Sequence, residues 1–209
     1  MKKLQRRKRE PVLTSITSAS LSAFAILVLT ACAGTGLVSS NSLSNETAQA
    51  AQVAHAAYQA MPRVDATCGL SNFQAEMLTQ VNTRRAAGAV CGTRKMPAAG
   101  SLDWNPQLHH AATLHALNMA TTGVYTHTGS YGLTLPQRVN AAGYDYALLG
   151  ENIDAQRTSV QAAIHSWMSS PQHCENIMRT QFRDIGVSCV SNSASQWGNY
   201  WTMELGVRR

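Results

Sequence analysis

Gly150-Glu151-Asn152-Ile153 is the middle of three short stretches that decide the fold of this 209-residue chain. The stretch Tyr125-Thr-His127-Thr-Gly129 precedes it, and Ser170-Pro-Gln-His173-Cys174-Glu-Asn-Ile177 follows it. Each stretch contains a side chain that can carry a proton or bind a metal. His127 and Glu151 are 24 positions apart and Glu151 and His173 are 22 apart, so no single helix or strand makes them neighbours. If these side chains meet, the tertiary fold brings them together.

The order of these stretches resembles the CAP superfamily, which comprises cysteine-rich secretory proteins, plant pathogenesis-related-1 proteins and bacterial relatives. Further matching segments are Leu102-Asp-Trp104-Asn105, Ser166-Trp167-Met-Ser-Ser170 and Phe182-Arg-Asp-Ile-Gly186-Val. The resemblance covers roughly residues 71–206. It implies an α+β fold, the three-layer α-β-α CAP sandwich, in which a central antiparallel sheet has helices on both faces.

Hydrophobic periodicity and helix-ending residues predict the same class of fold. Helices are predicted at residues 72–87, 106–122, 136–142 and 159–170. Strands are predicted at residues 146–153, 185–190 and 200–205. The last two strands are joined by a segment rich in turn formers, which predicts an antiparallel hairpin.

The N-terminus has the pattern of a bacterial lipoprotein signal. Six Lys and Arg residues lie in the first nine positions, and an apolar run centred on residues 21–29 follows. This run is shorter than the ~20 apolar residues that span a bilayer. Leu29-Thr30-Ala31-Cys32 is similar to a lipobox, so we expect residues 1–31 to be a signal peptide and Cys32 to be lipidated. A plain signal peptide with a chance cysteine is the alternative.

The segment after the signal predicts a lipid-anchored, extracytoplasmic domain. Residues 32–66 are rich in Ser, Ala, Asn, Gln and Thr, which indicates a flexible tether, and residues 67–209 then form the CAP domain. Ala33, in place of an aspartate after Cys32, resembles the signal for transport to the outer membrane in Gram-negative bacteria. We therefore expect a location in the bacterial cell envelope.

The charge balance argues against a nucleic-acid-binding function. The chain has 17 Lys and Arg and 11 Asp and Glu, but six of the basic residues and one acidic residue lie within residues 1–31. The mature part therefore has eleven basic and ten acidic residues. This composition lacks the excess of basic residues that is expected of a nucleic-acid-binding surface.

Four cysteines remain after Cys32, an even number that is typical of disulfides in an oxidising compartment. Cys68 and Cys91 flank the predicted helix 72–87, which is about 24 Å long. Bridged Cα atoms lie about 4.4 to 6.8 Å apart, so a bond between these two is disfavoured and two pairings stay open.

The resemblance implies one of these two pairings. Cys91 with Cys174 is similar to a pairing of bacterial CAP proteins, and it leaves Cys68 with Cys189. The alternative for Cys174 is a thiolate nucleophile beside His173.

The resemblance also implies a groove cluster. CAP proteins bring together two histidines and usually two glutamates, and His127, Glu151 and His173 match three of these four positions. Eukaryotic members have the second glutamate after the tryptophan, where this chain has Ser169 and Ser170. Glu175 is the candidate to replace it.

Two imidazoles and a carboxylate are also a plausible first shell for zinc, with His127, Glu151 and His173 as ligands. A hydrogen-bonded polar cluster or a non-catalytic metal site is the favoured interpretation, because no His-Glu-x-x-His or Gly-x-Ser-x-Gly motif is present. Glu151 and Glu175 as a glycosidase pair would require a carboxyl separation of about 5.5 Å, or of about 6.5 to 9.5 Å.

These features together predict a ligand-binding or interaction module and not an enzyme. The expected partners are the membrane, through the lipid anchor, and a lipid, glycan or protein ligand in the groove. We expect a monomer that requires no cofactor, with zinc as an optional ligand. The alternatives are a zinc-dependent hydrolase that uses His127, Glu151 and His173, and a structural lipoprotein whose site has no remaining activity.

Overall fold

The computed structural model describes residues 64–129 and 132–209. The predicted signal peptide, Cys32 and residues 33–63 of the predicted tether lie outside the described residues. Within the described part, no helix has both the length and the apolar character needed to cross a membrane.

A four-stranded sheet forms the middle layer. Its strand order is β3 (Asp103–Trp104), β5 (Asp184–Asn192), β6 (Gly198–Arg208) and β4 (Tyr146–Ala155). The predicted β5–β6 hairpin is confirmed, with Val187 opposite Met203, and β4 pairs antiparallel with the other side of β6. The short β3 pairs parallel with β5, so the sheet is not antiparallel throughout.

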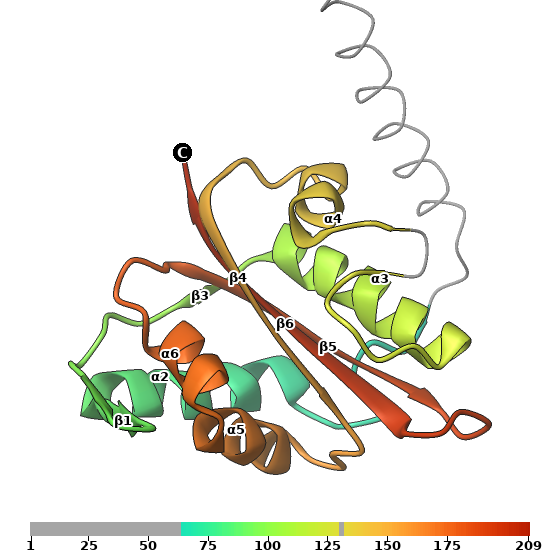
Figure 1. Cartoon of the computed structure of the whole chain (residues 1–209), viewed down its shortest axis with the longest axis horizontal. Coiled ribbons are helices and arrows are strands. Elements are labelled where there is room, and N and C mark those ends of the chain that lie inside the picture. Colours follow the sequence, from blue (N-terminus) through green and yellow to red (C-terminus); the bar gives the residue numbers. More distant parts are fainter. Residues whose placement is uncertain (1–63, 130–131) are drawn as a thin grey trace, which may run out of the picture. The chain divides into compact units, whose positions relative to one another are not determined.

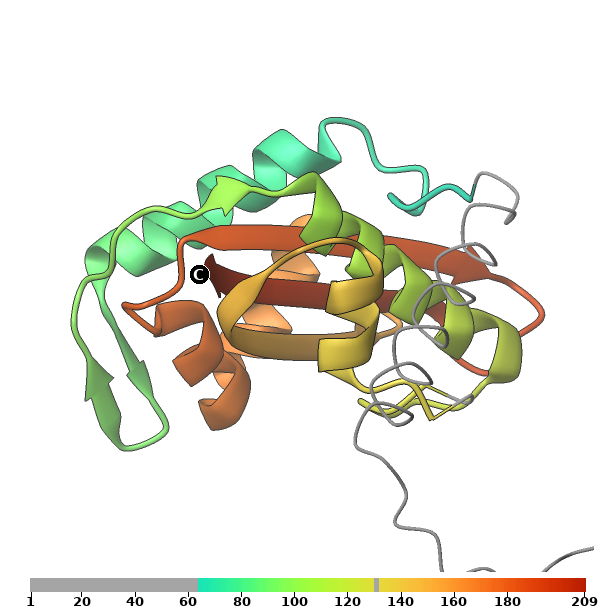
Figure 2. The same cartoon turned by 90° about the horizontal axis from the view of Figure 1, so that it is seen from above.

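Helices cover both faces of this sheet, as Figure 1 and Figure 2 show. One face carries α3 (Pro106–Thr122) and α4 (Leu135–Ala141). The other face carries α2 (Phe73–Ala87), α5 (Val160–Ser169) and α6 (Pro171–Met178). The predicted three-layer α-β-α sandwich is confirmed.

The larger core lies between the sheet and the face that carries α2, α5 and α6. Trp167 of α5 and Trp201 of β6 are fully buried and meet edge to face, with ring centroids 6.4 Å apart. The Trp167 indole N–H donates to the carbonyl of Ile153 at 3.1 Å, which satisfies its one polar atom. This bond also fixes α5 against β4.

The α3 helix begins and ends where its sequence predicts. The Asn105 side chain accepts from the backbone N–H groups of Gln107 and Leu108, and Pro106 occupies the first turn. Gly123 ends the helix with a φ of 72°, a left-handed conformation that glycine adopts without a steric penalty. The loop that follows carries His127.

The region around Pro171 differs from the prediction. The sequence predicts one helix that ends near this proline, whereas α5 ends at Ser169 and a separate helix, α6, begins at Pro171. Ser170 has extended φ and ψ of −94° and 122°, the conformation that a following proline imposes. The proline therefore starts a second helix as well as ending the first, and α6 carries His173 and Glu175.

A hairpin that the sequence analysis missed packs against α6. It consists of β1 (Ala89–Cys91) and β2 (Arg94–Met96), joined by Gly92 and Thr93. Gly92 has a φ of +61°, as the first position of a type II′ turn requires. A Cβ at this glycine would lie 3.1 Å from Pro171, so the turn sits directly on the start of α6.

Two disulfides join distant parts of the chain. Cys91 bonds Cys174 and Cys68 bonds Cys189, so both pairings expected from the family resemblance are confirmed. The alternative of a Cys174 thiolate nucleophile is wrong, because its sulfur is part of a buried bridge. The first bridge joins the β1–β2 hairpin to α6. The second joins Cys68, which precedes α2, to β5.

Candidate functional site

The structure joins His127 directly to Glu151. The ring nitrogen Nδ1 of His127 donates to Oε1 of Glu151 at 2.7 Å. The His127 side chain is 57% exposed, whereas that of Glu151 is only 4% exposed. A loop after α3 therefore places an imidazole at the surface, and a carboxylate buried on β4 holds it from behind.

Arg138 of α4 holds the other oxygen of this carboxylate. Its Nη2 contacts Oε2 of Glu151, and its Nη1 donates to the carbonyls of His127 and Leu133 at 3.2 and 2.8 Å. The guanidinium thus fixes both the carboxylate and the loop that carries the imidazole. Sequence reasoning missed Arg138, whose buried position within a short amphipathic helix gave no signal.

A second buried carboxylate lies on the neighbouring strand of the sheet. Glu204 of β6 is paired in register with Glu151 of β4, and its Oε1 is 3.6 Å from Nη2 of Arg138. Burial, and then the neighbouring charge of Glu151, raise the pKa of Glu204 well above its ordinary value. Burial would raise the pKa of Glu151 too, but the hydrogen bond from His127 and the charge of Arg138 outweigh it and lower that pKa.

The two carboxyl groups therefore titrate as a pair, and Glu204 is the one that takes up a proton first as the pH falls. Neither oxygen of Glu204 has a hydrogen-bond partner among the described residues. Sequence reasoning missed Glu204, although a glutamate between Met203 and Leu205 in an otherwise apolar strand was an available signal.

His115 of α3 closes the buried side of the cluster. Its side chain is fully buried, and its Nε2 lies 3.9 Å from Oε2 of Glu151. Burial lowers the pKa of His115 to about 4, with Glu151 raising it and Arg138 lowering it further. His115 is therefore neutral at pH 7. His115 recurs at helical spacing with the apolar residues of α3, a pattern that indicates burial but not proximity to Glu151.

Two amide side chains dock α6 onto the neighbouring part of β4. Asn152 donates to the carbonyl of His173 at 3.0 Å. Asn176 donates to Oδ1 of Asn152 at 2.9 Å and to the carbonyl of Glu151 at 3.1 Å. A side chain at Gly150 would clash with Phe182, since a Cβ there would lie 2.8 Å from its ring.

His173 is half-buried at this docked helix. Burial, and then the charge of His127, lower the pKa of His173. Among the described residues, no hydrogen bond or ion pair joins the His173 ring to His127 or Glu151. His173 is tied to the edge strand β4 through Asn152, which follows Glu151 and donates to the His173 carbonyl.

Comparison with known proteins decides the family. The sequence model of the cysteine-rich secretory protein family (CAP) matches residues 78–205, which is more than half of the chain. The chain belongs to the CAP family. No curated protein matches it significantly.

Solved CAP structures share this fold at low sequence identity. An extracellular protein with an SCP domain from Bacillus anthracis is 23% identical, covers 65% of this chain and has a TM-score of 0.53. The present chain spans 40% of that protein. An outer surface protein from Borrelia burgdorferi is 20% identical over 64% of this chain and 94% of its own, with a TM-score of 0.50. NaASP2 with Zn²⁺ is 15% identical over 69% of this chain and 83% of its own, with a TM-score of 0.45.

Glu175 of this CAP domain is engaged elsewhere. Its Oε2 accepts from Nη1 of Arg94 at 2.9 Å, and Arg94 belongs to the β1–β2 hairpin. Residues two apart on a helix point in nearly opposite directions, so α6 turns Glu175 away from the side on which His173 lies. The described contacts therefore connect His127 with Glu151 and leave Glu175 outside their cluster.

The CAP cluster does not have the arrangement of a zinc site. Within residues 64–129 and 132–209, no three His, Cys, Asp or Glu side chains are placed to hold one metal ion. Glu151 uses its two oxygens for His127 and Arg138, so it is not available as the third of the three protein ligands that catalytic zinc sites use. The donor set of the cluster therefore does not fit a catalytic metal.

Proposed function

We propose that this CAP protein is an extracytoplasmic binding module whose ligand contacts the edge of β4 at His127 and His173. One observation carries the proposal: the carboxylate of the cluster is buried and paired on both oxygens, while the imidazole that it holds is exposed. Such a carboxylate has no free position from which to accept a substrate proton. The group that it offers to a ligand is the oriented imidazole.

The cluster is suited to holding this imidazole in one orientation. Because ionised Glu151 can only accept a hydrogen bond, Nδ1 of His127 carries a proton, and in the neutral imidazole Nε2 is then the acceptor. Arg138 fixes the backbone of the same loop through the His127 carbonyl. A ligand hydroxyl or amide donor would therefore meet a preorganised acceptor at Nε2.

The expected ligand classes are those of the family: a lipid, a glycan or a protein. The relatives from Bacillus anthracis and Borrelia burgdorferi are described as an extracellular and an outer surface protein, which supports an extracytoplasmic location. Attachment through a lipid on Cys32 to the membrane, and to the outer membrane in a Gram-negative cell, is part of this proposal.

A binding experiment tests the proposal on the full chain in detergent micelles. The probes are phospholipid supplied in mixed micelles, soluble peptidoglycan fragments and an envelope protein extract separated into single components. We expect one class to bind saturably, with His127→Ala and His173→Ala each weakening binding about tenfold. His165→Ala is the matched control, because His165 is exposed on α5 and outside the cluster. Binding that both variants leave unchanged would contradict the proposed site.

Two further measurements test the anchor and the alternative function. Mass spectrometry of the mature protein should show a diacylglycerol-modified Cys32 at its N-terminus, and Cys32→Ser should release the protein from the membrane fraction. Calorimetric zinc titration with the same histidine variants tests the optional metal. Submicromolar zinc binding that both variants abolish would support the zinc-dependent hydrolase. It would also contradict the conclusion that Glu151 is not available as a metal ligand.

A further inference from the structure

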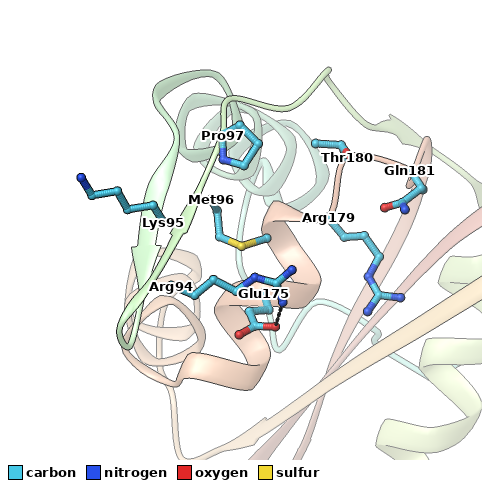
Figure 3. Close-up of a pocket in the computed structure, with 8 residues that line it drawn as sticks. All are labelled: Arg94, Lys95, Met96, Pro97, Glu175, Arg179, Thr180 and Gln181. Atoms are coloured by element: carbon cyan, nitrogen blue, oxygen red, sulfur yellow. Dashed lines mark hydrogen bonds and ion pairs between the residues drawn. The ribbon is translucent and has the colours of Figure 1, made fainter.

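A concave site lies between the β1–β2 hairpin and the turn after α6. Its volume is about 480 Å³, within the range of small-molecule sites, about 300 to 1,000 Å³. Three basic side chains line it, Arg94, Lys95 and Arg179, with a single carboxylate, Glu175. Figure 3 shows these residues around the hollow.

The positive charge of this pocket is not fully neutralised. Arg94 and Glu175 pair at 2.9 Å, which offsets one cation. In Figure 3 Lys95 extends outward from the hairpin, while Arg179 lies across the hollow from the Arg94–Glu175 pair. Within the described part of the chain, the Arg179 guanidinium has no carboxylate at ion-pair distance and stacks over the Phe182 ring at 5.6 Å. Arg179 is therefore a half-buried cation available to an external anion.

Buried contacts hold the walls of the pocket rigid. Arg85 of α2 is fully buried, and its guanidinium donates to the carbonyls of Ile177, Arg179 and Phe182 at 2.6, 3.0 and 3.3 Å. These bonds fix the turn that carries Arg179. A rigid wall lowers the entropy cost of binding a ligand, because the side chains are already placed.

The disulfide holds the opposite wall. Cys91 lies in β1 next to the turn before Arg94, and Cys174 directly precedes Glu175. The bridge therefore joins the two segments that face each other across the Arg94–Glu175 pair.

We propose that this pocket binds a small organic oxyanion, a carboxylate or a phosphate ester, with Arg179 as its principal charge partner. Met96 and Pro97 offer apolar contact for the body of the ligand, and Thr180 and Gln181 offer hydrogen-bonding groups. A guanidinium forms paired hydrogen bonds to carboxylate and phosphate oxygens alike. The site is separate from the His127 cluster and does not depend on the function proposed above.

Three probes with the same six-carbon chain test the proposal: hexanoate, hexyl phosphate and uncharged hexanamide. The full chain in micelles is labelled with ¹³C in its methionine methyl groups, and the Met96 signal, assigned with Met96→Leu, reports binding at the pocket. Because charged and uncharged probes partition differently into micelles, equilibrium dialysis against protein-free micelles gives the free concentration of each probe, and each affinity is calculated from it. We expect saturable shifts with an anion and binding of hexanamide that is at least about tenfold weaker. The tighter of the two anions identifies the head group, phosphate or carboxylate.

Charge variants assign the binding to Arg179. Arg179→Gln should weaken the affinity for the anion about tenfold. Arg84→Gln removes the same charge from the exposed side of α2 and should change this affinity less than about twofold. Glu175→Gln should tighten binding about threefold, because it frees Arg94 and removes the competing charge. His127→Ala should leave this binding unchanged, which separates the site from the His127 cluster.

Several outcomes would overturn the proposal. These are a Met96 shift that rises linearly without saturation, equal binding of hexanamide and the anions, and wild-type affinity in Arg179→Gln. Circular dichroism checks that each variant is folded. If Arg179→Gln does not fold, Glu175→Gln provides the test. An unchanged affinity for the anion in that variant would show that the charges of the pocket do not determine binding.

Discussion

Glu151 and Glu204 lie directly opposite each other on β4 and β6, and the guanidinium of Arg138 contacts both. The pKa of Glu151 is lowered and that of Glu204 is raised, so Glu204 is the carboxyl group of the pair that protonates first. Glutamine resembles a protonated glutamate, so the two positions should respond differently to the same substitution. We therefore expect Glu151 to carry the negative charge that balances Arg138, and Glu204 to hold the proton of the pair.

Substitution with glutamine tests this division at pH 7. Glu204→Gln should change the free energy of unfolding by less than about 1 kcal/mol, because glutamine has nearly the shape of a protonated glutamate and leaves the Glu151–Arg138 ion pair intact. Glu151→Gln should cost about 3 to 5 kcal/mol, because it leaves the buried Arg138 charge without an ionised partner. Urea unfolding of both variants measures the difference. Equal losses would show that the charge is not confined to Glu151.

The buried His115 should make stability depend on pH. Its folded pKa of about 4 lies below the unfolded value of about 6.5, so between these values the unfolded chain binds a proton that the folded chain does not. The free energy of unfolding therefore falls as pH drops through this window, by about 3 kcal/mol from this group.

His115→Gln should remove that part of the pH dependence, and His165→Gln, on the exposed face of α5, should retain it. Urea unfolding at a series of pH values between 4 and 7 provides the comparison. A His115→Gln profile parallel to wild type would show that His115 does not resist protonation in the folded protein.

Gly186 allows α3 to lie directly on β5. A Cβ at this position would be 1.9 Å from the backbone N of His109, so the backbone of α3 would have to move. Gly186→Ala should destabilise the fold by more than about 4 kcal/mol. Gly100→Ala is the control, because a Cβ there meets nothing within 4 Å, and its effect should stay within about 0.5 kcal/mol. Thermal unfolding distinguishes them; similar midpoints would contradict the observed packing.

Both disulfides should stabilise the domain, but only one should affect the oxyanion pocket. They join cysteines that are 83 and 121 positions apart in the sequence. By restricting the unfolded chain, each bridge should raise the free energy of unfolding by about 4 to 5 kcal/mol. Replacing Cys91 and Cys174 by serine should weaken anion binding, because the hairpin loses its link to α6. Replacing Cys68 and Cys189 should lower stability alone. NMR titration with hexanoate and hexyl phosphate, beside urea unfolding, checks both effects; equal pocket affinity in the two variants would show that the hairpin needs no covalent link.

The failure to predict α6 explains why Glu175 was grouped with His173. A proline often marks the end of a helix, whereas Pro171 occupies the first turn of the next one, where its missing N–H costs nothing. In a helix, the two-residue spacing of His173 and Glu175 separates their side chains onto different sides. The absence of a predicted helix therefore concealed the oxyanion pocket.

The sequence by itself determined the family, the bounds of most helices and strands, and the pairing of cysteines that the family resemblance implied. These features depend on short-range signals, such as the Asn105-Pro106 start of α3 and the turn formers between β5 and β6, or on motif order. Only the tertiary structure decided that Glu151 would be buried between Arg138 and His127. Those residues lie on separate elements, and a residue's local sequence does not specify which distant side chain will neutralise its charge. The free energy of a buried carboxylate depends on such partners, so the chemistry of the site was settled by packing.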